Sequence, residues 1–484
     1  MKRGNLAANL QRLSAGLLLL AGGCTVGPNY QRPGIAVGPE WSEAKQSGVD
    51  TRSAELTRWW TSFNDRALNS LVERAVKSNL DLRLAEARIR EARATRAGAA
   101  AGEWPTLDVS GSYSRNRASG NAFGSPGQGA VGAPRSGVKL EQNFFNTGFD
   151  ASWEIDVFGG VRRSIEAADA TVQASVEDRR DVLVTLLGDV AKNYIDLRGF
   201  QHRIDVARAN LKAEQETLEL TKVRFQAGLA SDLDVAQAEG QLNTTAAQIP
   251  TLESSLKQAA HRLDVLIGLE PGALWDEVSN TAPIPGLPSE VLIGLPSELL
   301  RRRPDIRRAE RQLAAATAQI GAATADLFPK FSLTGALGLQ SISASDWFTS
   351  GSRFWSIGPT ISWRVFDAGR IRANIEVRNA QQEQALTQYQ ITILTALEDV
   401  ENSLVNYSRE QERYRSLTAA VAANRRAVEM ATELYIRGLN DFLNVLVTQR
   451  ALYASESDLV QSEATMASDL VSLYKALGGG WETP

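Results

Sequence analysis

The chain has 484 residues, of which 43% are hydrophobic and 22% charged, a composition that folds and could fill two to four ordinary domains. Its formal net charge of −4 makes it a poor nucleic-acid binder. With a single cysteine it can form no internal disulfide, and its two histidines, His202 and His261, lie far apart without other ligands around them, so we predict no metal and no cofactor.

The N-terminus has the pattern of a bacterial signal peptide. A positively charged start and the apolar run of residues 13–21, too short to span a bilayer, lead through two glycines to Cys24. Small residues directly before a cysteine resemble a lipobox, so we predict that residues 1–23 are removed and that Cys24 carries lipid. The alternative is an ordinary secretory signal with a chance cysteine. Thr25 stands where an inner-membrane retention signal would have Asp, which by that sorting rule predicts the outer membrane.

An internal duplication organises the rest of the chain. Residues 79–107 match residues 303–331 at an offset of 224, and later positions match at an offset of 210. A glycine-rich insertion at residues 121–137 can absorb the difference. Chance similarity between alanine-rich helices is the alternative, but Pro and Gly positions also align. These positions are Pro105 with Pro329, Gly228-Leu229 with Gly438-Leu439, and Gly268 with Gly478.

Each half has the same predicted order of elements. Pro105 and Pro329 end the first helices, and Gly228 and Gly438 end the long ones. A 67-residue helix is about 100 Å long, too long for a globular domain, and its apolar residues keep coiled-coil spacing. The predicted elements are a first helix (79–103 and 304–327), a β-hairpin (106–158 and 330–366), a long helix (161–227 and 370–436) and a return helix (232–268 and 441–477).

The predicted strands alternate apolar and polar residues over about ten positions, the length that a tilted strand needs to cross a bilayer. We predict that Trp153, Ile155, Ile361 and Trp363 face lipid, and that aromatic residues near the strand ends, Phe354 among them, form interfacial girdles. A soluble sheet with one wet face is the alternative. Four strands cannot close a barrel, and two copies would leave no aqueous lumen, whereas three copies give twelve strands. The fold class is therefore a mixed one, an all-α coiled-coil barrel plus a transmembrane β-barrel that close as a homotrimer.

Several stretches resemble one known family. They are the run CTVGPNY at residues 24–30 with Pro33, the Trp59-Trp60 motif with Phe63 and Asp65, the Asn79-x-Asp81-Leu82 motif, and residues 295–331. The chain resembles the TolC-like outer-membrane efflux factors, in particular the NodT/OprM-type lipoproteins that serve RND pumps. The resemblance implies a trimer with a 12-stranded β-barrel, an α-helical barrel in the periplasm and an equatorial belt. Small departures are the doubled glycine before Cys24 and Asn29, where many relatives have Asp.

The resemblance and the duplication together predict the domain boundaries. A lipidated segment with an equatorial helix follows the signal peptide, and two repeats flank an equatorial linker. The predicted ranges are 1–23 for the signal peptide, 24–78 for the N-terminal segment, 79–269 for the first repeat, 270–302 for the linker, 303–478 for the second repeat and 479–484 for the tail.

The resemblance implies a passive exit duct for small molecules such as drugs or toxic compounds. Its partners would be a periplasmic adaptor protein, an inner-membrane RND-type pump and outer-membrane lipid, with no nucleic acid. Protein secretion through the same channel is the runner-up, and a periplasmic adaptor is a candidate from another class. An enzyme is least expected, because the sequence has no Ser/His/Asp order, metal cluster or glycine-rich phosphate loop.

The two turns between long and return helices are predicted to form the periplasmic tip. Gly228-Leu229 and Gly438-Leu439 would make the turns and contact the adaptor. In TolC-like channels a ring of aspartates from the return helix lines the closed pore, and by this resemblance Asp234 and its repeat partner Asn444 would form the periplasmic gate. Asp232 and Asp441 are further candidates. The alternative is that these acids only cap the return helices.

Overall fold

The computed structural model describes residues 25–43, 49–50, 52, 56–117, 119, 141–288 and 291–482. These residues form two compact units. We call them the strand unit (Met1–Arg32, Glu91–Val172 and Gln312–Leu386) and the helix unit (Pro33–Arg90, Gln173–Arg311 and Thr387–Pro484). Each unit takes segments from both predicted repeats. The two halves of the sequence therefore fold together, and neither forms a domain by itself.

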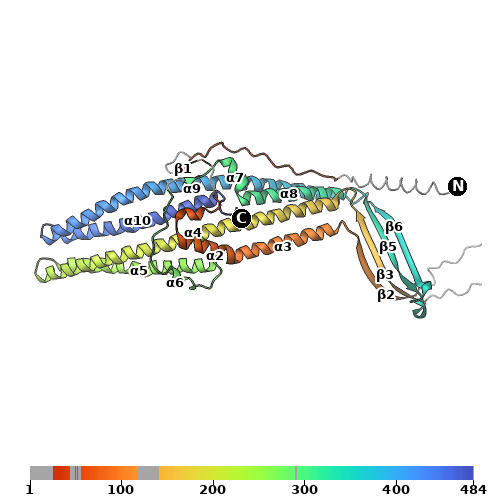
Figure 1. Cartoon of the computed structure of the whole chain (residues 1–484), viewed down its shortest axis with the longest axis horizontal. Coiled ribbons are helices and arrows are strands. Elements are labelled where there is room, and N and C mark those ends of the chain that lie inside the picture. The colour runs from red at the N-terminus through yellow and green to blue at the C-terminus, as the bar shows by residue number, and fades with distance from the viewer. Residues whose placement is uncertain are drawn as a thin grey trace, which may run out of the picture. The chain divides into compact units, whose positions relative to one another are not determined.

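The strand unit contains a four-stranded antiparallel sheet in the order β2-β3-β5-β6 (Figure 1). The strands are β2 (Thr106–Arg117), β3 (Glu141–Ile155), β5 (Lys330–Ser341) and β6 (Arg353–Ser362). The pairing of β3 with β5 joins the two predicted hairpins into one sheet. Two short 3₁₀ helices, η2 (Ala344–Asp346) and η3 (Ser350–Ser352), connect β5 to β6. The second hairpin, predicted over residues 330–366, is shorter than expected, because strand pairing ends at Ser362.

Four long helices connect with this sheet along the chain. Helix α3 (Leu80–Ala101) precedes β2, and α8 (Pro304–Ala325) precedes β5. Helix α4 (Gly160–Gln226) follows β3, and α9 (Arg370–Ile436) follows β6, each with 67 residues as predicted. Proline at positions 105 and 329 disfavours the helical conformation in the residue before it, so α3 and α8 end where the strands begin.

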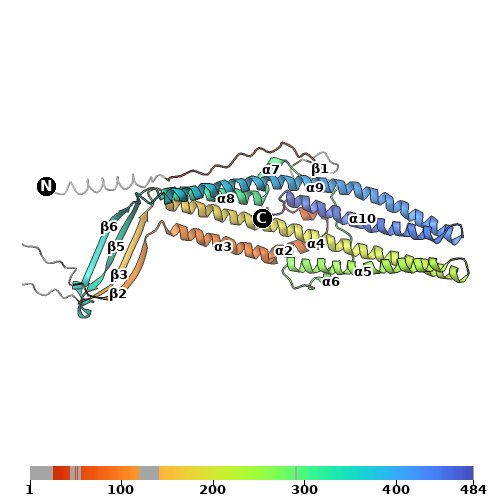
Figure 2. The same ribbon diagram turned by 180° about the vertical axis from the view of Figure 1, so that it is seen from behind.

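The helix unit holds the return helices α5 (Asp232–Leu266) and α10 (Phe442–Ala476). Both views show α5 running beside α4, and α10 beside α9 (Figures 1 and 2). Within α4, Gly199 and Gly188 mark its close approach to α10. A Cβ at Gly199 would lie 3.0 Å from that of Ala464, and one at Gly188 would lie 3.2 Å from the Lys475 side chain. The smallest residue thus allows two helix backbones to pack closely.

Smaller elements complete the helix unit. Its core includes an aromatic cluster in which the Trp59 ring stacks on Tyr474 at 5.2 Å between centroids, beside Trp60 and Phe63. The Tyr194 hydroxyl donates a hydrogen bond to Asp65, whose other oxygen caps α2. The elements are β1 (Val49–Asp50), η1 (Trp59–Phe63), α2 (Arg66–Ser78), α6 (Trp275–Val278), β4 (Val291–Leu292), which pairs in parallel with β1, and α7 (Pro296–Arg302).

The starts and ends of the repeated helices in this unit are built alike. Asn79, directly before α3, donates through Nδ2 to the carbonyl of Leu266 at the end of α5, at 2.9 Å. Arg303, directly before α8, donates through Nη1 to the carbonyl of Ala476 at the end of α10, at 3.1 Å. Both donors are related by the offset of 224 and both acceptors by the offset of 210. The duplication therefore extends to individual hydrogen bonds.

None of the helices in the described part of the chain combines the length and the apolar character needed to span a membrane.

Candidate functional site

One face of the sheet is apolar across all four strands. The register places Ile155, Phe331 and Ile361 in one row, and Trp153 opposite Leu333 on the same face. Ile361 is 65% exposed, although it is a large hydrophobic residue. Three of the predicted lipid-facing residues, Trp153, Ile155 and Ile361, therefore share one apolar face with most of the other apolar strand residues. Trp363 follows directly after β6 and is also exposed. Their contact with lipid stays a prediction. Phe354 is an exception to the expected girdle, since it pairs with Gly338 and lies on the opposite face.

The opposite face of the sheet is polar. Ser110 donates a hydrogen bond of 2.8 Å to Asp150, which lies across from Asp108. Serine, threonine and asparagine fill much of the rest of this face. The charged side chains that the described strands place there are Asp108, Asp150, Glu154 and Lys330.

Two tryptophans on the apolar face are held by matching hydrogen bonds. The Trp153 indole N–H donates to the carbonyl of Glu103 at 2.9 Å, and the Trp363 indole N–H donates to the carbonyl of Leu327 at 3.1 Å. Each acceptor lies two residues before the proline that opens a hairpin. The sequence pattern indicated these aromatic residues but not their partners, because the acceptors are backbone carbonyls.

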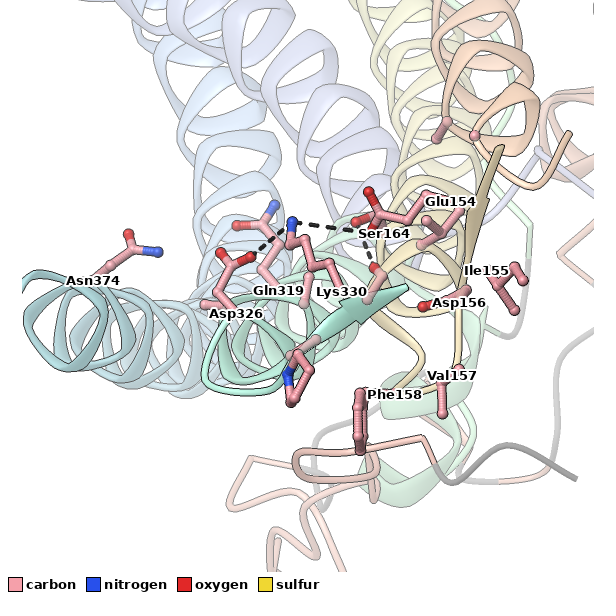
Figure 3. Close-up of a pocket in the computed structure, with 18 of the residues that line it drawn as sticks. Glu154, Ile155, Asp156, Val157, Phe158, Ser164, Gln319, Asp326, Lys330 and Asn374 are labelled. Atoms are coloured by element: carbon pink, nitrogen blue, oxygen red, sulfur yellow. Dashed lines mark hydrogen bonds and ion pairs between the residues drawn. The ribbon is translucent and has the colours of Figure 1, made fainter. Parts of the chain in front are cut away.

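A cavity of 510 Å³ lies in the strand unit where strands give way to helices. Figure 3 shows Lys330 in this cavity between two acids. Its ammonium lies 3.2 Å from Asp326 and 3.9 Å from Glu154. The ion pairs connect β3 with the α8–β5 junction. The cavity is therefore polar, and two neighbouring carboxylates balance the positive charge of Lys330.

The two predicted tip turns have the same backbone geometry. Gly228 and Gly438 have φ values of +70° and +71°. The amide of Leu229 donates to the carbonyl of Arg224, and the amide of Leu439 to that of Leu434. The glycine amides also donate hydrogen bonds, from Gly228 to Phe225 and from Gly438 to Tyr435. The two bonds at each turn form a Schellman cap, which needs a left-handed backbone conformation at the glycine. Leu229 and Leu439 are 66% and 70% exposed, so each turn presents an apolar side chain.

The predicted gate residues lie in the first turn of each return helix. Asp234 accepts from the backbone N–H of Ser231 at 2.8 Å, and its own backbone N–H donates to the Ser231 hydroxyl at 3.3 Å, which makes a capping box at the start of α5. The capping role considered for Asp234 is therefore present. Asn444 donates instead to the side chain of Asn440. Asp441 is the N-cap residue of α10 but makes no side-chain cap bond, and Asp232 is exposed.

The sequence did not predict a contact between the end of α4 and the end of α9. The Arg224 guanidinium donates to the carbonyl of Ile436 at 3.0 Å and lies over the Tyr435 ring. It borders a core shared by α4, α5, α9 and α10, whose buried residues are Leu218, Ala238, Ala431, Tyr435, Phe442, Val445 and Leu446. The sequence pattern of α4 does not indicate this role for Arg224, because its partners come from the other half of the sequence.

Half-buried carboxylates between α4, α9 and α10 form another unpredicted feature. Burial and the negative charge of Glu410 together raise the pKa of Asp469 to about 6, against the opposing positive charge of Lys192. Among the described residues, no three His, Cys, Asp or Glu side chains gather as a metal site would require. His202 lies 3.1 Å from the carbonyl of Ala282. The predicted lipid attachment residue, Cys24, lies outside the described residues.

Comparison with known proteins supplies the family. The family model "Outer membrane efflux protein" matches residues 71–269 and 295–479. The chain is 33% identical over 473 residues to "Nodulation protein T" of Rhizobium leguminosarum bv. trifolii, covering 96% of each. It is 32% identical to "Solvent efflux pump outer membrane protein SrpC" of Pseudomonas putida, covering 96% of this chain and 97% of that protein. The solved outer-membrane channel OprN superposes with a TM-score of 0.87 at 37% identity, over 95% of this chain and 100% of that one.

The chain belongs to the outer membrane efflux protein family. It is an outer-membrane channel component of an efflux system, as the sequence predicted, and its location is the bacterial outer membrane. The mixed fold class, with four strands and long paired helices, is confirmed for the single chain.

Proposed function

We propose that this chain closes with two copies of itself into a passive exit duct for small molecules. The edges of the sheet carry this proposal. Strand β2 pairs only with β3, and β6 pairs only with β5 among the described strands. Open edges leave unpaired amide and carbonyl groups, which lipid cannot satisfy. Pairing β6 of one copy with β2 of the next removes every edge, and three copies give twelve strands.

The two faces of the sheet support the same arrangement. The face with Trp153, Ile155, Ile361 and Trp363 would meet lipid, and the face with Asp108 and Asp150 would line an aqueous lumen. The energy for transport would come from an inner-membrane RND-type pump, since a channel of this construction only offers a path. We further propose that Cys24 is lipidated, which mass spectrometry of the mature N-terminus would test. An unmodified Cys24 would refute it.

We propose that the helix turns around Gly228 and Gly438 are the periplasmic tip and that the adaptor docks on them. The exposed leucines Leu229 and Leu439 support this. Large apolar side chains exposed at matching positions of both turns are typical of a protein-binding surface. The proposed gate is a ring of three Asp234 carboxylates, with Asn444 as a neutral counterpart. Such a ring would focus a negative potential and favour cations.

Single-channel conductance in planar bilayers tests the gate and separates it from capping. Asp234→Asn removes three charges per trimer and keeps a side-chain oxygen that can accept from the Ser231 amide. Ser231→Ala removes the hydroxyl that accepts from the Asp234 amide and keeps the charge. We expect Asp234→Asn to lower the cation preference and the block by a trivalent cation added on the periplasmic side. Ser231→Ala should leave both unchanged. Equal effects of the two variants would reduce Asp234 to a cap.

A further inference from the structure

The chain just after Cys24 is bound in a specific way to the strand unit. The amide of Val26 donates to the carbonyl of Phe158, in the turn between β3 and α4, at 3.1 Å. Phe158 is labelled at the rim of the cavity in Figure 3, and its ring stacks on Phe328 at 4.6 Å. Further along, Tyr30 packs on Ala170, Ala314 and Ala315. Residues 25–30, which we call the docking segment, thus contact both α4 and α8.

One buried arginine on α4 binds the backbone of the docking segment. Arg163 is only 4% exposed. Its Nε donates to the carbonyl of Val26 at 3.1 Å, and its Nη2 donates to the carbonyl of Gly27 at 3.4 Å and to Oδ1 of Asn29 at 2.6 Å. Its Nη1 donates to Glu166 at 2.7 Å, which balances the charge. All three guanidinium nitrogens therefore donate hydrogen bonds, and three of these four bonds go to the docking segment.

Glycines allow the docking segment to lie against the helices. Gly27 has a φ of +86°, and a Cβ there would lie 2.4 Å from the Cα of Gly321 on α8. A Cβ at Gly321 would lie 2.8 Å from Cγ and Nε of Arg163. Gly159 faces Thr25 in the same way, at 2.5 Å. At these contacts even a methyl group would displace the segment or its binding surface.

The two residues that contact the docking segment are not repeated in the other half of the chain. At an offset of 210 the partner of Arg163 is Ala373, and at an offset of 224 the partner of Gly321 is Ala97. The helices occur twice in the chain, but the docking segment occurs once. Both residues that contact the docking segment here, Arg163 and Gly321, therefore differ from their repeat partners.

We propose that Arg163 and Gly321 form a receptor for the docking segment that holds the mature N-terminus independently of its lipid. The receptor joins helix α4 of the first repeat to helix α8 of the second through a peptide that neither repeat contains. In the sequence the docking segment directly follows Cys24, the residue proposed to carry lipid. This receptor is separate from the proposed gate, so either proposal can fail alone.

Amide hydrogen exchange of the N-terminal peptide, measured by mass spectrometry on the purified full-length protein, tests the receptor. We expect slow exchange at Val26, because its amide is bonded to Phe158. Gly27→Val and Arg163→Ala should each speed this exchange by about tenfold or more. Asn29→Ala removes a single acceptor and should have a smaller effect in the same direction. It therefore remains informative if the stronger variants fold poorly.

Two controls fix the interpretation. Gly34→Val changes a nearby glycine at which a Cβ would meet no atom within 4 Å, and it should leave the exchange unchanged. Cys24→Ser removes the lipid but not the receptor, and Val26 should stay protected. Loss of protection in Cys24→Ser to the level of Gly27→Val would overturn the proposal, because the lipid would then hold the segment. Unchanged exchange in both Arg163→Ala and Asn29→Ala would overturn it as well.

Discussion

The guanidinium of Arg224 lies 4.6 Å from the centroid of the Tyr435 ring and bonds the last carbonyl of α9. This contact ties the end of one long helix to the end of the other. Removing it costs a hydrogen bond to a charged group, about 1.5–3 kcal/mol, and a cation–π contact of about 0.5–1 kcal/mol. It therefore adds to the shared core in holding the two turns together.

We expect Arg224→Ala to loosen both turns, raise single-channel conductance and lower the thermal stability of the protein. Arg437→Ala is the matched control, because Arg437 lies beside the same turns but pairs only with exposed Glu433 one helical turn away. Conductance is measured in planar bilayers, and unfolding by circular dichroism. Equal behaviour of the two variants would show that the Arg224 contact has no special part in holding the turns.

The register of β6 predicts opposite outcomes at neighbouring positions. Ile361 lies on the apolar face and Ser362 on the polar one. An arginine costs about 2–4 kcal/mol at the middle of a lipid face and less towards its edge, where Ile361 lies one residue from the end of β6. Ile361→Arg should therefore reduce the amount of assembled protein in outer-membrane fractions, whereas Ser362→Arg should assemble and alter conductance. The reverse ranking would mean that the polar face meets lipid.

Asp469 should make stability depend on pH. Its pKa of about 6 in the folded chain exceeds the ordinary value of 3.8. Between these values the folded state holds a proton that the unfolded state has lost, so the free energy of unfolding falls as pH rises from about 4 to 6, by at most about 3 kcal/mol. Asp469→Asn should remove this slope and be more stable than the parent at pH 7.5. Thermal unfolding at pH 5 and 7.5 checks this, and a constant difference between the two proteins would contradict it.

The equivalent donors Asn79 and Arg303 should contribute differently to the free energy of unfolding. Arg303→Ala breaks ion pairs with Asp305 and Asp399 in a largely buried place and should cost about 3–5 kcal/mol. Asn79→Ala loses neutral hydrogen bonds and a helix cap, about 1–3 kcal/mol. Arg303→Asn introduces the residue of the other repeat, and its loss of stability should lie between those of Arg303→Ala and Asn79→Ala. Chemical denaturation measures all three, and a larger loss in Asn79→Ala would refute the ranking.

The long elements could be predicted from sequence because each depends on a local rule. Helix α9 was predicted at residues 370–436 and is found at Arg370–Ile436, since no Gly or Pro interrupts it and Gly438 ends it. Period-two alternation likewise predicted which strand residues share a face. In β6 the prediction ran too far, because apolar alternation continues to Val365 while strand pairing stops at Ser362.

The contacts that join distant segments could not be predicted in this way. Arg224 with Ile436, Trp153 with Glu103 and Arg163 with Val26 each use a backbone carbonyl as acceptor. A carbonyl is present in every residue, so the sequence gives no sign of which one is used.

The docking segment also bears on the order in which the protein matures. Gly27 and Gly321 lie 294 positions apart in the chain. The N-terminus is synthesised and exported first, whereas α8 follows only after the whole first repeat. Residues 25–30 therefore find the Arg163 side of their binding site in the first repeat and the Gly321 side only when α8 has been made. Their attachment is completed late in biogenesis, and a chain that stalls before α8 would keep a more loosely held N-terminus open to periplasmic proteases.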